Sequence, residues 1–547
     1  MNQSQARSIE VDAIVIGAGF SGLYMLHRLR ALGFNTRLIE AADGVGGTWF
    51  WNRYPGARCD SESHYYCYSF SDEIRKEWKW SCRYPAQPEI LGYLNFVADR
   101  LDLKKDIDFG TRVTAGNFDE DTHRWLIETD SGETIQAQFL ITGVGNTSTP
   151  ARPNVPGLDS FSGKVYHTAL WPHEGVDFSG QRVGVVGTGS SGIQSIPMIA
   201  EQAAHLTVFQ RTANYSVPAR NHVLTDDMRR ELEENHEDTR RLVLASPIGM
   251  PFELPQQSAL EVSDEERTAK LDSLWAIGSF RFMFTSYNDL VFDLKANATV
   301  ANYIEARIRD TVLDPAVADV LCDFNHPAGT KRPPIDTNYY ETFNRDNVSI
   351  VSIRANPLKE ATTDGLTMQN GDHHKLDAIV FATGFDTVTG TLLKLNLHGR
   401  GGQSLAEKWT DGPRAYLGLC TANFPNLFMI TGPGSPGILT NFPGCIEQNV
   451  DWITSVMVRM RETNAIEIEA TSDAEMQWAQ EIVEAADQTL FPLVDSWYMN
   501  ANVPGKPRVF TAYFNGMHTY ADVCDDVAKS DYNGFEIRSR KMAEAAN

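Results

Sequence analysis

Val11-Asp12-Ala13-Ile14-Val15-Ile16 leads directly into Gly17-Ala18-Gly19-Phe20-Ser21-Gly22, and this stretch decides the fold. The apolar, β-branched run predicts a buried strand, and the helical spacing of the residues from Leu23 to Leu32 predicts a helix after it. The glycines between them allow a tight turn, a close approach of the backbone to a pyrophosphate, and close packing of helix on strand. The stretch therefore predicts a strand–turn–helix unit that binds a dinucleotide.

The same pattern occurs a second time further along the chain. The predicted strand Arg182 to Val186 leads into Gly187-Thr188-Gly189-Ser190-Ser191-Gly192, and a helical stretch continues to about Glu201. One glycine motif alone is a weak signal, but both copies lie between a strand and a helix, as phosphate binding requires. Two such units predict an α/β fold with two Rossmann-like dinucleotide-binding domains.

The residue that ends the second strand of each unit indicates which nucleotide binds there. Glu40 lies 23 positions after Gly17, where a carboxylate accepts hydrogen bonds from ribose hydroxyls and repels a 2′-phosphate. The second unit has Arg211-Thr212 instead, and a guanidinium pairs well with a 2′-phosphate unless it is only a solvated surface group. Two dinucleotides with neither a cysteine pair nor a metal cluster imply FAD that receives electrons from NADPH.

Composition excludes several other classes of protein. The formal net charge of −23 disfavours a nucleic-acid partner, because phosphate backbones require clustered Lys and Arg. The seven cysteines form no CxxC pair, which argues against a disulfide framework, a zinc site and a dithiol centre and favours the cytoplasm. No apolar run reaches 18 residues, and Met1 to Glu10 is polar, so neither a membrane span nor a signal peptide is expected.

The 547 residues are enough for about three domains of ordinary size. Between Asn221 and Asp336 the chain is charge-rich and poor in strand-like runs, which predicts a helical insertion, and strand-like segments return near Val348 and at Ala378 to Ala382. The predicted domains are discontinuous: residues 1–150 and 387–547 for FAD, 151–223 and 334–386 for NADPH, and 224–333 for the insertion.

One segment carries a resemblance to a known family. Phe161 to Pro172, FSGKVYHTALWP, fits the fingerprint FxGxxxHxxxW(P/D) of type I Baeyer–Villiger monooxygenases. The chain resembles the cyclohexanone, phenylacetone and steroid monooxygenases over nearly its whole length. The matching segments are Gly46 to Trp49, Asn52 to Asp60, Gln210 to Thr212, Lys331-Arg332, Ala382 to Asp386, and Trp497 through Gly505-Lys506.

The resemblance implies a soluble enzyme that uses FAD, NADPH and O₂ to convert ketones, cyclic and bulky ones included, into esters or lactones. The implied route passes through a C4a-peroxyflavin and a Criegee adduct and needs no obligate protein partner. Flavin monooxygenases that oxidise nitrogen or sulfur are the alternative, but they usually lack the tryptophan of Trp171-Pro172. A redox sensor that forms only hydrogen peroxide is a further alternative.

The resemblance also assigns roles that the residues alone leave open. Without it, Lys331-Arg332 is a basic pair before two prolines and Asp60 is a turn residue. With it, Arg332 is the catalytic cation, Asp60 orients it, and Lys331 joins the 2′-phosphate site. His167 is expected to be a hydrogen-bonded structural residue that couples domain movement to turnover.

The remaining assignments concern the cofactors and the ketone. The predicted cofactor-binding residues are Gly17, Gly19, Ser21, Gly22, Glu40, Thr48, Trp49, Trp51, Arg58, Asp60, Tyr66, Val113, Gly187, Thr188, Gly189, Ser190, Ser191, Gly192, Arg211, Thr212, Lys331, Arg332, Phe442 and Trp497. The predicted substrate pocket comprises Asn146, Thr147, Gly437, Ile438, Leu439 and Phe442. Phe280 to Phe284 resembles a segment of the cyclohexanone enzymes but fits a helix core slightly better, and Thr188 to Pro218 resembles the steroid enzyme.

Overall fold

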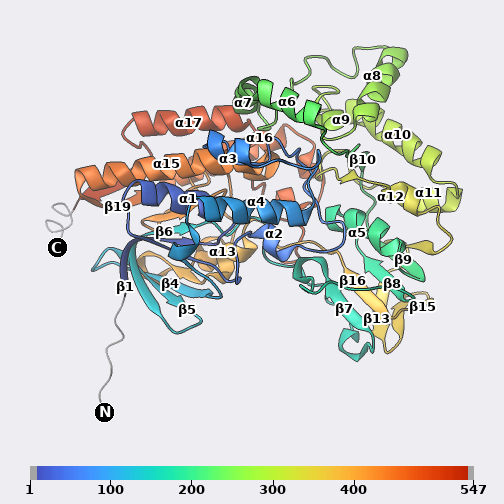
Figure 1. Cartoon of the computed structure of the whole chain (residues 1–547), viewed down its shortest axis with the longest axis horizontal. Coiled ribbons are helices and arrows are strands. Elements are labelled where there is room, and N and C mark those ends of the chain that lie inside the picture. Colours follow the sequence, from blue (N-terminus) through green and yellow to red (C-terminus); the bar gives the residue numbers. More distant parts are fainter. Residues whose placement is uncertain (1–8, 540–547) are drawn as a thin grey trace.

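The computed structural model describes residues 9–539, which are arranged around two sheets with helices on their outer faces (Figure 1). In the first sheet, β1 pairs in parallel with both β2 and β6, and Ile16 lies opposite Ile39 and Thr142. The strands of this sheet, in spatial order, are β17 (Leu397–His398), β4 (Val113–Asp119), β5 (Arg124–Thr129), β6 (Thr134–Thr142), β1 (Ile9–Ile16), β2 (Thr36–Ile39) and β3 (Ile107–Asp108), with β18 (Leu427–Met429) beside β6.

The C-terminal part of the chain returns to this first sheet. β18 pairs with the end of β6, where Leu427 lies opposite Leu140. The long helix α15 (Phe442–Thr463) packs against α1 (Phe20–Ala31), and Figure 1 shows the orange helix beside the blue one. On α1 the side chains of Leu23, Leu26 and Leu29 are fully buried. All residues from Phe20 to Leu26 are buried, so the first half of this helix is enclosed on every side.

The second sheet is parallel throughout, and α5 (Ser190–Ala200) packs on it. Its strands, in spatial order, are β12 (Val348–Ser352), β9 (His205–Gln210), β8 (Arg182–Val186), β16 (Ala378–Phe381) and β7 (Lys164–His167). A small antiparallel sheet of β13 (Leu358–Thr362), β14 (Gly365–Met368) and β15 (His373–Lys375) is inserted before β16.

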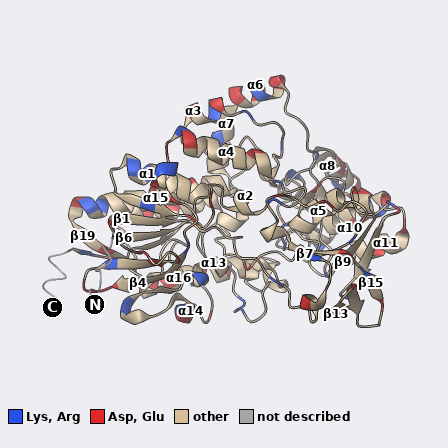
Figure 2. Ribbon diagram, turned by 60° about the horizontal axis from the view of Figure 1, so that its bottom comes forward, with Lys and Arg blue, Asp and Glu red and all other residues tan. Residues whose placement is uncertain are grey.

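Between β10 (Val217–Pro218) and β11 (Ile335–Asp336) the chain is helical. The helices of this insertion are α6 (Asp226–Glu234), α7 (His236–Ala245), α8 (Asp264–Ile277), α9 (Arg281–Phe284), α10 (Leu294–Thr311) and α11 (Pro315–Leu321). Figure 2 shows many charged residues on outer helices such as α6, whereas the strands of the sheets are largely uncharged. No residue of α6 or α7 is fully buried, so these two helices lie on the surface.

The predicted fold class, two Rossmann-like α/β units with a helical insertion, is confirmed. The first predicted helix begins earlier than expected, at Phe20 instead of Leu23, because Gly19 serves as its N-cap. The predicted limits of the discontinuous domains stay a prediction. In the part of the chain that the structure describes, no helix has both the length and the apolar character needed to cross a membrane.

The other elements complete the two units. They are α2 (Thr48–Trp51), α3 (Asp72–Glu77), α4 (Gln87–Arg100), α12 (Tyr339–Thr342), α13 (Gly390–Lys394), α14 (Leu405–Lys408), α16 (Ser472–Asp487), α17 (Met517–Lys529), β19 (Ala465–Ala470) and β20 (Phe535–Ser539).

A buried carboxyl group lies on β11. Ser216 Oγ donates a hydrogen bond of 2.6 Å to Asp336, and the backbone N–H of Tyr339 donates another of 3.3 Å. Burial raises the pKa of Asp336 from 3.8 to about 6. Because the folded state binds this proton more tightly than the unfolded state, the stability that it contributes is present below pH 3.8 and is lost as the pH rises through about 6.

Asp336→Asn is therefore expected to gain stability relative to the unmodified protein as the pH rises from 5 to 7.5. The full effect of a pKa shift of this size is about 3 kcal/mol, and about 1.4 kcal/mol of it falls between pH 5 and 7.5. The midpoint of thermal unfolding at each pH would measure this part. Asp377→Asn is the control, because hydrogen bonds from Arg182 lower the pKa of Asp377 to about 2, below the pH range tested. A stability difference between Asp336→Asn and the unmodified protein that does not change with pH would contradict the prediction.

Candidate active site

The first glycine loop has the geometry that a pyrophosphate requires. A Cβ atom on Gly22 would lie only 1.7 Å from the carbonyl oxygen of Gly17, so no larger residue fits there. Helix α1 starts at Phe20 with neither a side-chain cap nor an acidic residue in its first turn. Its first N–H groups are therefore available to an anion.

Glu40 lies directly behind this loop, at the end of β2. One carboxylate oxygen accepts a hydrogen bond of 2.6 Å from the N–H of Ala18, and the other accepts one of 2.8 Å from Ala42. The side chain is buried, and this burial raises the pKa of Glu40. The carboxylate fixes the loop and retains lone pairs for ribose hydroxyls, as predicted from its position.

Aromatic side chains lie beside the first loop. Trp49, on α2, donates a hydrogen bond of 3.1 Å from Nε1 to the hydroxyl of Tyr66, whose ring packs edge-on against Phe20 at 5.3 Å. Trp51 is half-buried at the end of the same helix. The side chain of Val113 is buried in an apolar cluster that includes Ile14 and Ile16 of β1. The predicted contact of Val113 with a cofactor stays a prediction.

The second glycine loop differs from the first in how open it is. A Cβ atom on Gly189 would meet nothing within 4 Å, whereas one on Gly19 would lie 3.3 Å from Gly47. Thr188 donates a hydrogen bond of 2.9 Å to the carbonyl oxygen of Thr212, which ties the loop to the end of β9. Helix α5 also starts without a side-chain cap or an acidic residue in its first turn, so its N–H groups are available to a phosphate.

Arg211 and Lys331 come close to each other although 120 positions separate them. Arg211 is exposed just after β9, and Lys331 is half-buried. Burial and the charge of Arg211 together lower the pKa of Lys331. Two neighbouring cations fit a phosphate dianion. Their predicted role at the 2′-phosphate of NADPH stays a prediction.

Arg332 and Asp60, the predicted catalytic pair, form a bidentate ion pair. Nε of Arg332 donates to one carboxylate oxygen at 2.7 Å and Nη2 donates to the other at 2.9 Å. The guanidinium lies over the ring of Phe280, 4.9 Å from its centre. Burial opposes the charge, but Asp60 outweighs it and raises the pKa of Arg332, so the arginine keeps its proton at every working pH.

Sequence reasoning missed Tyr498 at this pair. Its buried hydroxyl lies beside Arg332, and burial raises the pKa of Tyr498 to about 12, so the phenol stays protonated. Trp497, the predicted neighbour of the nicotinamide, stacks on Tyr498 with ring centres 4.4 Å apart. The only signal in the sequence was that Tyr498 directly follows Trp497.

The segment from Phe280 to Phe284 fits both the helix-core interpretation and the resemblance to the cyclohexanone enzymes in part. Phe282 is fully buried and packs against Trp275 and Tyr303, as a helix-core residue would. Phe280 is also buried, yet its ring lies on the guanidinium of Arg332. The segment therefore packs into the core through Phe280, Phe282 and Met283, and Phe280 also belongs to the candidate site.

The predicted substrate-pocket residues lie on two separate segments. Asn146 is buried, Thr147 is half-buried, and the carbonyl oxygen of Asn146 accepts a hydrogen bond of 3.0 Å from Val388. Gly437–Leu439 forms a short 3₁₀ turn, and the half-buried Phe442 begins α15. Their membership of one pocket stays a prediction.

His167 lies where the two units are connected. Its Nδ1 accepts a hydrogen bond of 3.1 Å from the N–H of Ala169, while Nε2 lies 3.2 Å from Thr383 Oγ1 and 3.4 Å from the carbonyl oxygen of Ala151. Burial lowers the pKa of His167, which favours the neutral ring. The N–H of Ala151 also donates to Gly384 at 2.9 Å, so the two connecting segments run side by side.

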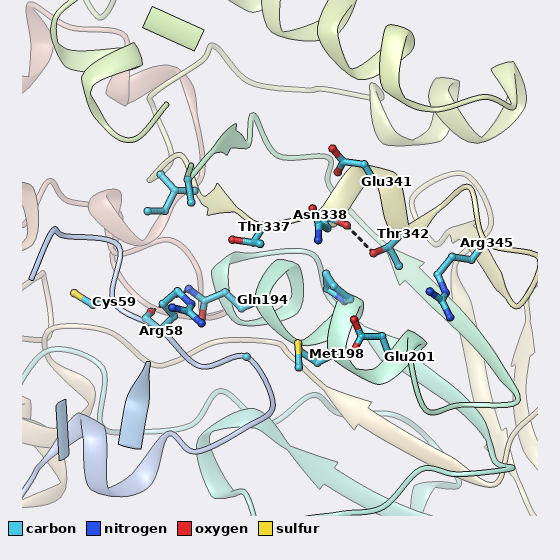
Figure 3. A pocket seen from close by; sticks show the side chains of 14 residues that line it. Arg58, Cys59, Gln194, Met198, Glu201, Thr337, Asn338, Glu341, Thr342 and Arg345 are labelled. Carbon is cyan, nitrogen blue, oxygen red and sulfur yellow. Dashed lines mark hydrogen bonds between the residues drawn. The ribbon is translucent and has the colours of Figure 1, made fainter. Parts of the chain in front are cut away.

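Arg58 lines a cavity of about 300 Å³ (Figure 3). Gln194 of α5 and Asn338, just before α12, also line it, and Nη1 of Arg58 donates to the carbonyl oxygen of Tyr84. Among the described residues that line this cavity there is none from either glycine loop. The predicted contact of Arg58 with a cofactor stays a prediction.

These features define an oxidoreductase with two dinucleotide sites. They are the two glycine loops, the buried acid behind the first, the two cations at the second and the paired arginine. Comparison with known proteins agrees. A family model described as "Pyridine nucleotide-disulphide oxidoreductase" matches residues 14–280. A phenazine N-monooxygenase of Lysobacter antibioticus is 44% identical, with 96% of this chain and 97% of that protein covered.

Two further relatives identify the family. A Baeyer–Villiger monooxygenase of Pseudooceanicola batsensis is 43% identical, with 97% of each chain covered. The solved structure of an oxidised steroid monooxygenase bound to NADP is 48% identical, with a TM-score of 0.92 over 97% of this chain and 100% of that one. The chain belongs to the Baeyer–Villiger monooxygenase family, which confirms the predicted resemblance and the predicted enzyme class, a flavin-dependent monooxygenase.

Proposed function

We propose that this protein converts ketones into esters or lactones with FAD, NADPH and O₂. The observation that carries the proposal is the Arg332–Asp60 pair, in which Arg332 keeps its positive charge and lies over an apolar ring. An oxygen insertion next to a carbonyl passes through states with negative charge on oxygen, and a fixed cation in a site with little water stabilises such charge well.

FAD and NADP(H) are the cofactors. The fit of the residues supports FAD at the first loop, with the free N–H groups of α1 at its pyrophosphate and Glu40 at its ribose. NADPH fits the second loop, with Arg211 and Lys331 at its 2′-phosphate. When bound, FAD reduced by NADPH supplies the activated oxygen. Solved relatives have been described in complex with FAD and NADP.

The residues of this chain orient the reaction and stabilise its charge. Asp60 fixes the plane of the Arg332 guanidinium through two hydrogen bonds and leaves Nη1 free of that pair. That nitrogen can donate to the carbonyl oxygen of a ketone, where negative charge develops. Tyr498 stays a neutral hydrogen-bonding group beside the arginine, because its pKa lies at about 12.

Cyclic ketones, bulky ones included, are the proposed substrates. Relatives of this chain are named cyclohexanone and cyclopentanone monooxygenases, and one solved relative is described with cyclohexanone bound. Apolar pockets separate ring sizes by only about 1–3 kcal/mol per methylene, so broad acceptance is expected. We further propose a cytoplasmic location, which the seven free cysteines support, and no obligate protein partner.

Oxidation of a nitrogen or sulfur atom is the competing function, and one relative is named a phenazine N-monooxygenase. Trp171, at the end of the family fingerprint, argues for the ketone reaction; it is buried against Tyr166 and Phe178. Purified yellow protein with NADPH and O₂ should convert cyclohexanone or a larger cyclic ketone into a lactone. A product set restricted to sulfoxide, N-oxide or hydrogen peroxide over a wide ketone panel would overturn the proposal.

A further inference from the structure

A second, buried charge cluster lies next to the catalytic pair, on the same loop as Asp60. The carboxylate of Glu62 is 6% exposed and accepts a hydrogen bond of 2.8 Å from Nη2 of Arg83. Nε of Arg281 lies 4.0 Å from the same oxygen. Burial lowers the pKa of His64 to about 4, so this neighbouring ring is neutral at pH 7 and the cluster consists of one carboxylate and two arginines.

Both arginines connect Glu62 to one turn of the helical insertion. Arg281 itself begins α9, and its guanidinium lies over the ring of Phe252 at 4.3 Å. Arg83 donates from Nη1 to the carbonyl oxygen of Ile277, the last residue of α8, at 3.0 Å. The turn between these two contacts is therefore held at both ends by partners of one carboxylate.

This turn carries Phe280, whose ring lies under Arg332. Gly278 and Ser279 have φ angles of 67° and 72°, and the second is a left-handed conformation that is unfavourable for serine. Such a conformation persists only where its surroundings fix it. The backbone N–H of Ser279 donates to Pro218 at 2.8 Å, and the arginines bound to Glu62 supply the other fixed points.

The backbone of Glu62 also orders the loop on its other side. Its carbonyl oxygen accepts hydrogen bonds from the N–H groups of Tyr65 and Tyr66 at 3.2 and 3.0 Å. Tyr66 in turn accepts the hydrogen bond from Trp49 at the first cofactor site. Glu62 thus connects the loop of Asp60, the aromatic residues Trp49 and Tyr66, and the turn of Phe280.

We propose that Glu62 is a positioning residue for Arg332. It ties the loop that carries Asp60 to the turn that carries Phe280, so that the two groups that contact the arginine are held at a fixed separation. The inference rests on the proposed function, in which Arg332 stabilises charge on the reacting oxygen. Without the carboxylate, the like charges of Arg83 and Arg281 lie near each other without the acid that pairs with both. The loop of Asp60 then loses its shared link to the two ends of the turn.

The test compares Glu62→Gln with the unmodified holoenzyme. We expect kcat with a cyclic ketone to fall by a factor on the order of ten to a hundred, because small displacements of a positioned group cost this much. The KM for NADPH should stay the same, since Arg211 and Lys331 contact neither Glu62 nor its arginines. Hydrogen exchange of residues 277–284 should become at least about tenfold faster, and this measurement needs no reaction at all.

Glu475→Gln is the matched control. Glu475 is also buried, and it pairs with Lys408 at 2.7 Å and accepts a hydrogen bond of 2.6 Å from Thr421. Glu475→Gln should lower the midpoint of thermal unfolding as Glu62→Gln does. It should leave kcat and the hydrogen exchange of residues 277–284 unchanged. If both variants lower kcat alike, Glu62 contributes only general stability and the proposal is wrong.

A double variant tests the link directly. Arg281→Gln added to Glu62→Gln should cost little more than Glu62→Gln alone, because loss of the carboxylate already breaks the link through Arg281. Additive losses, or unchanged exchange of 277–284 in Glu62→Gln, would overturn the inference. Should Glu62→Gln not fold, Arg281→Gln alone gives the same readout at a half-exposed position. If the unmodified enzyme forms no ester from any ketone, the proposed function fails, and hydrogen exchange still decides whether Glu62 holds the turn.

Discussion

Arg332→Ala is expected to lower the rate of ester formation by a factor of about 10³, the upper range for loss of one preorganised donor to a developing oxyanion. Reduction of the flavin by NADPH should continue, because Arg211 and Lys331, the residues proposed to bind the 2′-phosphate, are unchanged. The measurement is product analysis by gas chromatography, run beside stopped-flow recording of flavin bleaching. NADPH consumed without ester should appear as hydrogen peroxide.

Two further variants show which property of Arg332 matters. Arg332→Lys keeps the positive charge but loses the planar fork that binds both oxygens of Asp60, so an intermediate rate is expected. Asp60→Asn keeps the shape of the partner and removes its charge. Ester formation by Arg332→Ala within a few-fold of the unmodified enzyme would refute the assignment of Arg332, whatever the stability of the variant.

Arg211→Ala is expected to raise the KM for NADPH by about 10- to 100-fold, the range for hydrogen bonds to a charged group. The KM for NADH should change little, since NADH has no 2′-phosphate for Arg211 to bind. Steady-state oxidation of both nucleotides at saturating O₂ gives the two values on one protein preparation. Lys331→Ala should act in the same direction.

Arg345→Ala is the matched control for this prediction. Arg345 is also an exposed arginine of the second unit, but it lines the cavity of Figure 3 and lies away from Arg211. Its removal tests whether general loss of positive charge on an acidic protein weakens NADPH binding. Equal increases of KM for NADPH and NADH in Arg211→Ala would show that the arginine does not recognise the 2′-phosphate.

Local sequence was enough to predict the two glycine loops, the strands and helices around them, and the roles suggested for Glu40 and Arg211. Each of these depends on residues within about 25 positions of one another, where strand, turn and helix follow in fixed order. The antiparallel strands β4 to β6 and the small sheet β13 to β15 were not predicted. Their short segments alternate only in part between buried and exposed residues, which weakens the signal of a strand.

The proposed catalytic pair could not be predicted from the residues alone. Asp60 and Arg332 are 272 positions apart, and each looks ordinary in its own segment. Only the resemblance to a family brought them together in advance. The resemblance did not predict Tyr498 and Glu62, because a tyrosine or a glutamate becomes informative only when its burial and its distant partners are known.

The return of the C-terminal part to the first sheet has a consequence for synthesis on the ribosome. The end of β6, at Leu140 to Thr142, stays without its partner strand β18 until roughly 280 further residues have been synthesised. All strands of the second sheet have left the ribosome by then. At a synthesis rate of about 5–20 residues per second, an apolar strand edge stays unpaired for tens of seconds. The second unit should therefore fold first, and the nascent first unit is the part of the chain that most needs protection by chaperones.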